Sequence, residues 1–363
     1  MAERLQCIIG HIDSRRVCLA QQPSAALSNS IDKPDDIVIV SALRTPIGKA
    51  KRGSFKDTYP DDLLAVVLKA VIKDAKLNPI EIDDICVGNV NDPKSAISAR
   101  LAQVHCGIPD SVPCYTTNRQ CSSGLIACMN VAANIKSGFY NIGIGAGVES
   151  MSMYAMGLGD WKPNPKMAES KEGMDLTIPM GITSENVAAR FNVSRQDQDQ
   201  FALSSQLKAK RARDEGLFDA EIVPVTTTVK DQNDEEKTVT VTKDEGIRPT
   251  TIENLQKLKP AFKQNGTTTA GLTVNDVDVF EINEAFASQC LYSARELGIP
   301  LEKLNPKGGA IALGHPLGCT GARQIATLLH ELKRRGRRSR GVVSMCIGTG
   351  MGAAAVFEYP GQA

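Results

Sequence analysis

The stretch VPCYTTNRQCSSGLIACMNVAANIKSGFYNIGIGAGV, residues 112–148, decides the fold class. Its first part, 112–117, predicts a strand. The segment 122–135 predicts a helix, because Leu125, Met129 and Ala132 are apolar at helical spacing. The glycine-rich segment 142–148 predicts a second, buried strand. A strand, a helix and a strand in this order favour an α/β architecture with a largely parallel sheet.

The same alternation extends to both sides of this stretch. On the N-terminal side the predicted elements are strands at 37–40 and 85–90 and helices at 61–76 and 96–105. On the C-terminal side they are strands at 277–282, 341–346 and 353–359 and helices at 283–297 and 319–335. Between them, residues 151–262 are rich in Met, Pro and charge. We interpret this segment as an inserted domain with helix in 185–215 and a β-hairpin in 226–242.

Composition excludes several functional classes. The chain has 363 residues with 42 Lys plus Arg and 41 Asp plus Glu, a formal net charge of +1. General nucleic-acid binding requires a large basic excess, so we expect no nucleic-acid partner. No apolar run approaches the roughly 18 residues of a membrane span, so no membrane insertion is expected. Ten cysteines without a CxxC pair argue against a zinc ribbon, and we expect no metal.

Two cysteines stand where chemistry is possible. Cys121 follows a strand and precedes a helix, so its thiol faces a helix N-terminus, which favours the thiolate. Cys346 lies in a glycine-rich turn after a strand, where it can act as an acid or a base and where backbone N–H groups can point into a cavity. The alternative for both residues is a packed, buried thiol at a turn.

Two further residues complete the candidate set. His315 stands among glycines and a proline in residues 308–318, where it can serve as a general base or an oxyanion donor; a satisfied core histidine is the alternative. Asn283 follows a strand directly, so it is either an active-site amide or simply a helix N-cap. His105 and His330 lie in helical patterns and are interpreted as structural.

Taken in order, these motifs resemble the thiolase family. The matching segments are Arg44-Thr45-Pro46, Asn118 to Gly124, Gly147 to Met151, Lys259 to Phe262, Asn283 to Phe286, Gly314-His315-Pro316 and Cys346-Ile347-Gly348. The resemblance covers nearly the whole chain after Asp36. The Cys-Ser-Ser-Gly form is similar to the peroxisomal 3-ketoacyl-CoA branch of the family.

The resemblance implies a fold of two pseudo-equivalent α/β halves in layered αβαβα order. The implied domains are a presequence and linker at 1–35, a nucleophile half at 36–150, a loop domain covering coenzyme A at 151–262, and a truncated second half at 263–363. It implies a homodimer. It also implies no cofactor, with acyl-CoA and coenzyme A as substrates.

The resemblance also implies the chemistry, an acyl transfer that cleaves 3-ketoacyl-CoA with coenzyme A in fatty acid β-oxidation. His315 takes the proton of Cys121, which attacks the keto carbon, and Cys346 protonates the departing enolate. His315 with a water held by Asn283 forms one oxyanion site, and the N–H groups of Cys121 and Gly348 form the other. Arg248 resembles a family residue near the coenzyme A nucleotide.

The N-terminal residues contain a candidate targeting signal. Arg4-Leu5, five residues and His11-Ile12 resemble the N-terminal peroxisomal signal, which implies an import receptor as a partner. The alternatives are a mitochondrial presequence or an amphipathic tail. Residues 21–34 are interpreted as a linker.

One departure from the family affects activity. Family members carry further strands and helices between the positions of Gly271 and Leu272, and here the two residues adjoin. Missing strands would leave sheet edges unpaired. Three hypotheses stay open: an active 3-ketoacyl-CoA thiolase, a catalytically impaired chain acting at most as a dimer partner, or an acetoacetyl-CoA thiolase.

Overall fold

The computed structural model describes residues 36–154, 162, 164–231, 233–248, 250–256, 274 and 277–361. Four sequence predictions fall outside these residues: the targeting signal at 4–12, the linker at 21–34, the motif at 259–262, and the junction between Gly271 and Leu272. Among the described residues, no helix is long and apolar enough to cross a membrane.

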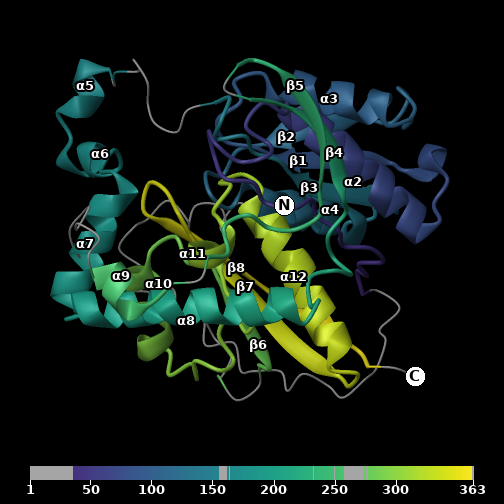
Figure 1. Cartoon of the computed structure of the whole chain (residues 1–363). Helices are drawn as coiled ribbons and strands as arrows, with labels where there is room; N and C mark the ends of the chain where they lie inside the picture. Colours follow the sequence, from purple (N-terminus) through teal and green to yellow (C-terminus); the bar gives the residue numbers. More distant parts are fainter. Residues whose placement is uncertain are drawn as a thin grey trace, which may run out of the picture. The chain divides into compact units, whose positions relative to one another are not determined.

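The first half contains a parallel three-stranded sheet in the order β2-β1-β3 (Figure 1). The strands are β1 (Asp84–Gly88), β2 (Cys114–Thr117) and β3 (Gly143–Gly147). In the central strand β1, Ile85 lies opposite Cys114 on one side and Ile144 on the other. The predicted strands at 85–90, 112–117 and 142–148 are therefore confirmed, with small shifts at their ends.

Helices cover both faces of this sheet. They are α2 (Pro60–Ala75), α3 (Ser95–His105) and α4 (Ser123–Lys136), with a short 3₁₀ helix at Pro79–Glu81. Ile85 and Val87 of β1 pack in one core cluster with α2 and α3, whereas Cys86 packs with Ala127 of α4. Alternate residues of β1 thus face opposite helical layers, as the period of two in a strand requires.

The predicted buried strand at 37–40 is wrong. Residues 37–40 belong to no strand, and Val38 and Val40 are 74% and 77% exposed. A β-branched run becomes a strand only when a neighbouring strand satisfies its backbone groups. Among the described residues, no strand lies beside this segment or along the outer edge of β3.

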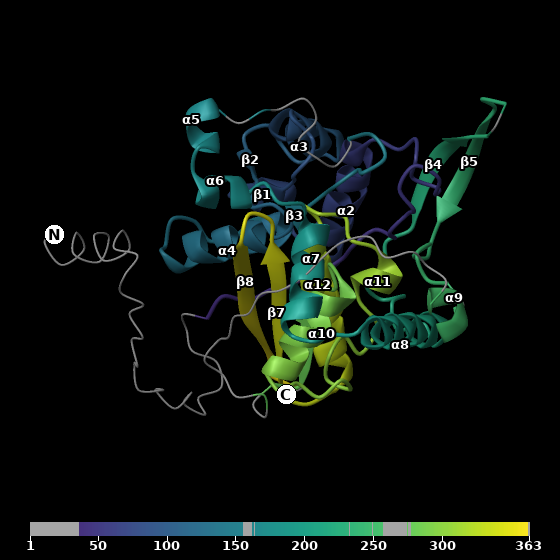
Figure 2. The same cartoon turned by 90° about the vertical axis from the view of Figure 1, so that its left-hand side faces the viewer.

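The segment after the first half is helical and carries a hairpin. Its elements are α5 (Pro165–Ala168), α6 (Lys171–Asp175), α7 (Met180–Arg190), α8 (Arg195–Asp214), β4 (Val225–Lys230), β5 (Glu236–Val241) and α9 (Ile252–Gln256). The predicted hairpin is confirmed, and it extends away from the two sheets (Figure 2). The single helical region predicted at 185–215 is two helices, because Ser194 and Asp197 form a capping box that starts α8.

The second half repeats the plan of the first with a different third strand. Its sheet has the order β6-β7-β8, formed by β6 (Val279–Ile282), β7 (Ser339–Ile347) and β8 (Met351–Tyr359). Strands β6 and β7 are parallel, whereas β7 and β8 are antiparallel. The helices are α10 (Ala287–Glu296), α11 (Ala310–Leu313) and α12 (Thr320–Arg334).

Helices α4 and α12 join the two halves. A Cβ placed on Gly124 would lie 2.8 Å from the carbonyl oxygen of Gly318, and one on Gly321 would lie 2.3 Å from the nitrogen of Leu125. These glycines let the N-terminal ends of the two helices approach closely. On their other sides α4 packs on the first sheet and α12 on the second, where Leu328 contacts Gly341 of β7. The layers therefore follow the predicted αβαβα order.

Candidate active site

Cys121 lies in the tight turn between β2 and α4. The preceding Gln120 has φ 49°, and Cys121 itself is 8% exposed. Burial raises the pKa of the Cys121 thiol, although the N–H of Gly348 donates to its sulfur and opposes the shift; the Glu149 carboxylate adds to the rise. Backbone N–H groups lower this pKa as expected, but burial outweighs them, so deprotonation requires a nearby base.

His315 occupies the loop between α11 and α12. The preceding Gly314 has φ 119°, a conformation that favours glycine. Nδ1 of His315 lies 2.7 Å from Thr320 Oγ1, and Nε2 lies 3.3 Å from Asn283 Nδ2. Burial, reinforced by the positive charge of Arg323, lowers the pKa of His315 to about 4. The imidazole is therefore neutral at pH 7 and able to accept a proton.

Asn283 follows β6 and faces His315. The predicted helix at 283–297 begins only at Ala287, with Phe286 as its N-cap, so the N-cap alternative for Asn283 is wrong. Its side chain is buried, and its Oδ1 has no hydrogen-bond partner among the described residues. A buried carbonyl oxygen without a partner is suited to hold a water molecule.

Cys346 and Gly348 lie at the C-terminal end of β7, close to the nucleophile Cys121. Burial raises the pKa of the Cys346 thiol to about 12, and the charge of Cys121 contributes to the rise, which places the two sulfurs near each other. The N–H of Gly348 points at the Cys121 sulfur. The alternative of an isolated packed thiol is therefore less favoured for Cys346.

Glu149 links the two halves beside the nucleophile. Its carboxylate accepts hydrogen bonds from Val90 N at 3.1 Å and Asn91 N at 3.2 Å in the first half, and from Gly318 N at 2.9 Å in the second. Gly318 is required there, since a Cβ would lie 2.6 Å from Asn89 Cα. This role of Glu149 could not be predicted from the sequence, because the three donors are backbone groups.

Glu284 holds the loop that carries His315. Its carboxylate accepts hydrogen bonds from Ser205 Oγ at 2.6 Å, Asn305 Nδ2 at 2.8 Å and Ile311 N at 3.2 Å. The residue is 3% exposed. The Glu284 carboxylate therefore holds α11 in place just before His315. The Asn-Glu-Ala-Phe motif alone did not predict this role.

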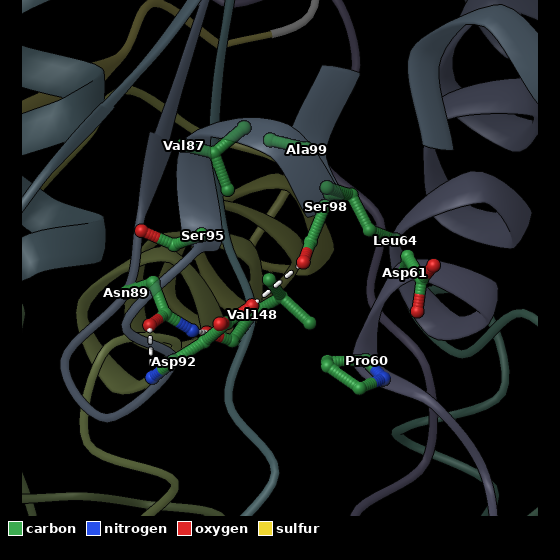
Figure 3. Close-up of a pocket in the computed structure, with 10 residues that line it drawn as sticks. All are labelled: Pro60, Asp61, Leu64, Val87, Asn89, Asp92, Ser95, Ser98, Ala99 and Val148. Atoms are coloured by element: carbon green, nitrogen blue, oxygen red, sulfur yellow. Dashed lines mark hydrogen bonds between the residues drawn. The ribbon is translucent and has the colours of Figure 1, made fainter. Parts of the chain in front are cut away.

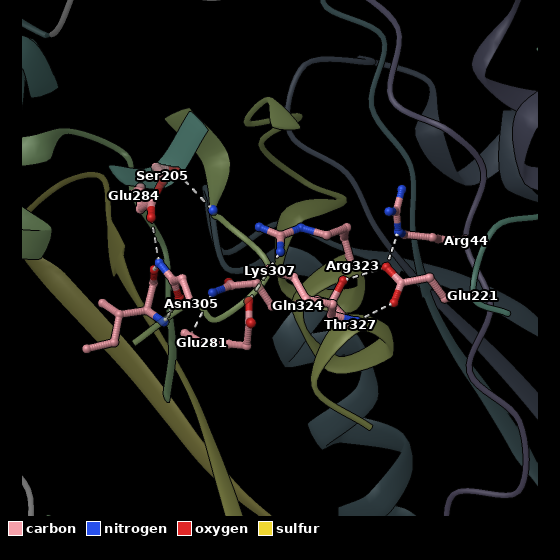
Figure 4. Close-up of polar contacts among 12 residues, drawn as sticks. Arg44, Ser205, Glu221, Glu281, Glu284, Asn305, Lys307, Arg323, Gln324 and Thr327 are labelled. Carbon is pink, nitrogen blue, oxygen red and sulfur yellow. Dashed lines mark hydrogen bonds and ion pairs between the residues drawn. The ribbon is translucent and has the colours of Figure 1, made fainter. Parts of the chain in front are cut away.

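A buried ionic network centres on Glu221 (Figure 4). Glu221 bonds to Arg44 at 2.8 Å, to Lys307 at 2.9 Å and to Thr327 Oγ1 at 2.8 Å. Arg44 also forms two 2.8 Å bonds to Asp244. The network therefore joins the first half, the inserted segment and the second half.

Arg248 lies at the edge of this region. Its side chain is exposed, and its backbone N–H donates to Gln206 Oε1 at 3.0 Å. Two residues earlier, Gly246 approaches α11 so closely that a Cβ would lie 2.4 Å from the Ala312 carbonyl oxygen. The guanidinium can therefore reach solvent close to the loop that carries His315.

A small pocket elsewhere has no part in this site. It lies at the carboxyl end of β1, between the N-terminal ends of α2 and α3 (Figure 3). Asp92 on its wall already accepts hydrogen bonds from Lys94 N at 2.8 Å and Ser98 Oγ at 2.7 Å. These bonds are those of a helix start, so the pocket offers no catalytic group.

Comparisons with known proteins agree with this geometry. The family described as "Thiolase, N-terminal domain" matches residues 37–277, and "Thiolase, C-terminal domain" matches residues 247–359. The chain is 50% identical to "3-ketoacyl-CoA thiolase A, peroxisomal" of Mus musculus, over 99% of this chain and 100% of the relative. It is 49% identical to "3-ketoacyl-CoA thiolase, peroxisomal" of Homo sapiens, with the same coverage.

Solved structures of thiolases have the same fold as this chain. The dimeric peroxisomal thiolase of Saccharomyces cerevisiae superposes with a TM-score of 0.79 and 41% identity, covering 90% of this chain and 98% of that one. The acetyl-CoA acetyltransferase of Bacillus anthracis superposes with a TM-score of 0.76 and 32% identity, covering 88% and 98%. The arrangement of a buried thiol, a neutral histidine and a second thiol is thus set in a shared fold, and the chain belongs to the thiolase family.

Proposed function

We propose that this chain is an acetyl-CoA C-acyltransferase that cleaves 3-ketoacyl-CoA with coenzyme A in fatty acid β-oxidation. The observation that carries the proposal is that the Cys121 thiol of the first half meets the Cys346 end of β7 in the second half, in a chain about half identical to peroxisomal 3-ketoacyl-CoA thiolases over their whole length. His315 is proposed to reach the same thiol. Coenzyme A serves as a substrate, and the chemistry requires no bound cofactor.

The first step is attack by Cys121. His315 takes the thiol proton at Nε2, and the sulfur attacks the keto carbon of the substrate. The bond between the α and keto carbons then breaks, and the Cys346 thiol gives its proton to the departing acetyl-CoA enolate. Its high pKa, about 12, keeps this donor protonated at pH 7.

The second step regenerates the enzyme. The Cys346 thiolate takes the proton of coenzyme A, whose sulfur attacks the acyl-Cys121 thioester. The bond from the acyl carbon to Cys121 breaks, an acyl-CoA two carbons shorter leaves, and the Cys121 thiolate takes back the proton held by His315. Negative charge develops on two oxygens. One is stabilised by His315 and a water held by the Asn283 amide, and the other by the N–H groups of Cys121 and Gly348.

Arg248 is proposed to meet the nucleotide of coenzyme A. Its exposed guanidinium beside the His315 loop supports this role, because guanidinium groups bind phosphate in a bidentate manner. The inserted segment at 151–262 would then cover the coenzyme A site, between a nucleophile half at 36–150 and a second half at 263–363.

We infer a peroxisomal location, since the similar relatives are named peroxisomal. The motif from Arg4 to Ile12 would bind an import receptor, and residues 1–35 would form the presequence and linker. Replacing His11 should then leave the protein in the cytosol, and continued import of that variant would refute the signal. A homodimer is proposed from the dimeric yeast relative.

One observation favours a second candidate, a catalytically impaired chain that acts at most as a dimer partner. The alignment with the mouse relative spans 430 positions, whereas this chain has 363 residues, so at least 67 positions have no counterpart here. The exposed run at 37–40 supports the view that the sheet of the first half is incomplete, and we propose that the second half is incomplete as well. An acetoacetyl-CoA thiolase is the lesser alternative.

The deciding experiment is coenzyme A-dependent cleavage of a medium-chain 3-ketoacyl-CoA by the purified chain. Cys121→Ala should abolish it, and Cys128→Ala, which removes a partly buried thiol of α4, should not. No turnover from soluble, cooperatively melting protein favours the impaired chain. Turnover of acetoacetyl-CoA alone favours the lesser alternative.

A further inference from the structure

Thr320 is the first residue of α12 and is completely buried. Its hydroxyl donates to the Pro316 carbonyl oxygen at 3.0 Å, and the hydroxyl oxygen, Thr320 Oγ1, lies 2.7 Å from His315 Nδ1. A hydroxyl has one proton to donate. Because that proton goes to Pro316, Oγ1 presents a lone pair to the imidazole, and Nδ1 must carry the proton that joins them.

The other side of the ring agrees with this assignment. Asn283 Nδ2 lies 3.3 Å from Nε2, and an amide nitrogen only donates. A proton on Nε2 would place two hydrogen-bond donors, Nε2–H and the Asn283 amide N–H, opposite each other with no acceptor between them. The Nε2–H tautomer could avoid this conflict if the Asn283 amide were flipped and the Thr320 hydroxyl donated to Nδ1. The hydroxyl would then no longer donate to the Pro316 carbonyl oxygen. The arrangement with Nδ1–H therefore makes one hydrogen bond more.

We propose that Thr320 is a positioning residue that holds neutral His315 in the Nδ1–H tautomer, so that Nε2 carries no proton and can accept the proton of Cys121 in exchange for the Asn283 hydrogen bond. The inference rests on the proposed function for its catalytic consequence, but the tautomer itself is a property of the free protein. The hydrogen bond on one ring nitrogen decides which form of the ring is available at the other.

The tautomer can be measured directly. The chain has only four histidines, so ¹⁵N-histidine labelling gives a simple spectrum, and His315→Asn identifies the signals of His315. Wild-type protein should show a protonated Nδ1 and an unprotonated Nε2. Thr320→Val keeps the shape but removes the acceptor, and the Nε2–H tautomer should then be populated. Thr320→Ser should keep the wild-type pattern.

Thr327→Val is the matched control. Thr327 is equally buried on the same helix, but its hydroxyl bonds to Glu221 at 2.8 Å and not to His315. This variant should leave the His315 signals unchanged. Thr320→Ala serves as a second variant should Thr320→Val not fold.

Catalysis supplies an independent readout. Thr320→Val should lower kcat for thiolysis about 10- to 100-fold, within the range that general-base catalysis contributes, and leave the KM for coenzyme A within about twofold. Thr320→Ser should restore kcat to within about threefold. If the wild-type chain does not turn over, the proposed function fails, and the spectra alone decide the tautomer.

Three results would overturn the inference. The first is a protonated Nε2 in wild-type His315. The second is an unchanged Nδ1–H tautomer in Thr320→Val. The third is full kcat in a Thr320→Val protein whose tautomer has changed, because the hydroxyl would then have no catalytic consequence.

Discussion

The two halves of the molecule share a plan, yet they control their catalytic groups by different means. Around Cys121 the first half offers apolar packing, with Leu125 beside it, and backbone N–H groups. Around His315 the second half buries charge, since Glu281, Glu284 and Arg323 are each 3% exposed or less. Burial keeps the Cys121 thiol protonated and is also the main reason that His315 is neutral, and in the second half the buried positive charge of Arg323 reinforces it.

The largest expected effect tests the dependence of Cys121 on His315. His315→Ala should lower the rate of acyl transfer about 10²- to 10⁴-fold, since Cys121 then has no base. Added to Cys121→Ala, it should cost almost nothing further, because groups that act as a unit are not additive. Rates of the two single variants and the double variant measure this. His105→Ala, an exposed histidine in α3, is the control.

Independent losses in the double variant would contradict a unit formed across the two halves. They would mean that His315 supports a step that does not involve the thiol.

The next effect concerns the network that binds the halves together. Although burial alone would raise it, Lys307 and Arg44 bring the pKa of Glu221 down to about 2. Glu221→Ala would leave Lys307 buried without its carboxylate partner and Arg44 with Asp244 alone, and should destabilise the fold by about 3–5 kcal/mol. Urea unfolding measures the change, with the exposed Glu236→Ala in the hairpin as control.

A loss below about 1 kcal/mol would show that water replaces the Glu221 carboxylate. The network would then not be what holds the halves in register.

The third effect is a pH dependence of stability. Burial, opposed by Arg323 and Lys307, raises the pKa of Glu281 to about 7 from an unfolded value of 4.5. The folded protein therefore holds a proton that the unfolded chain releases, and this stabilisation is complete below pH 4.5 and lost as pH rises through 7. Glu281→Gln should remove the loss, which amounts to about 3 kcal/mol.

His315 works in the opposite direction. Its pKa falls from 6.5 to about 4, so its contribution is complete above pH 6.5 and lost as pH falls through 4. The two contributions offset each other in the wild type. Unfolding free energies between pH 4 and 8 should therefore rise with pH in Glu281→Gln and fall with pH in His315→Asn. Glu331→Gln, farther along α12, should match the wild type.

In both halves, the features that the sequence predicts correctly are those set by local patterns. Elements with strong local patterns were placed correctly: the helix expected at 319–335 is Thr320–Arg334, and the strand expected at 85–90 is Asp84–Gly88. Periodicity and caps are local, so they can be recognised without the fold. The positions of Cys121 and His315 in their turns followed for the same reason, whereas Cys346 lies within β7, paired with Gly352 of β8, and not in the turn that the sequence predicted.

What could not be predicted depends on distant partners. Glu281 and Arg323 are 42 positions apart and meet only because α12 packs on β6. The helix α11 is held by the Glu284 carboxylate, and the pKa of Cys121 is raised by burial that the helix N-terminus does not overcome. The family resemblance identified residues, but it carried no information on these energies.

The smallest expected effect is at residues 37–40, an apolar run that pairs with no described strand. We compare it with β1, an apolar run that pairs with two strands. Val38 and Val40 are exposed, whereas Val87 of β1 is completely buried. Val38→Thr and Val40→Thr should each change the unfolding free energy by less than about 0.5 kcal/mol, because exposed side chains lose little on replacement. Val87→Thr has the same shape but buries a hydroxyl in the core and should cost about 1–3 kcal/mol. A cost at Val38 and Val40 equal to that at Val87 would mean that residues 37–40 are covered in solution. The first sheet would then have a further strand, and the two halves would be more alike than their described strands indicate.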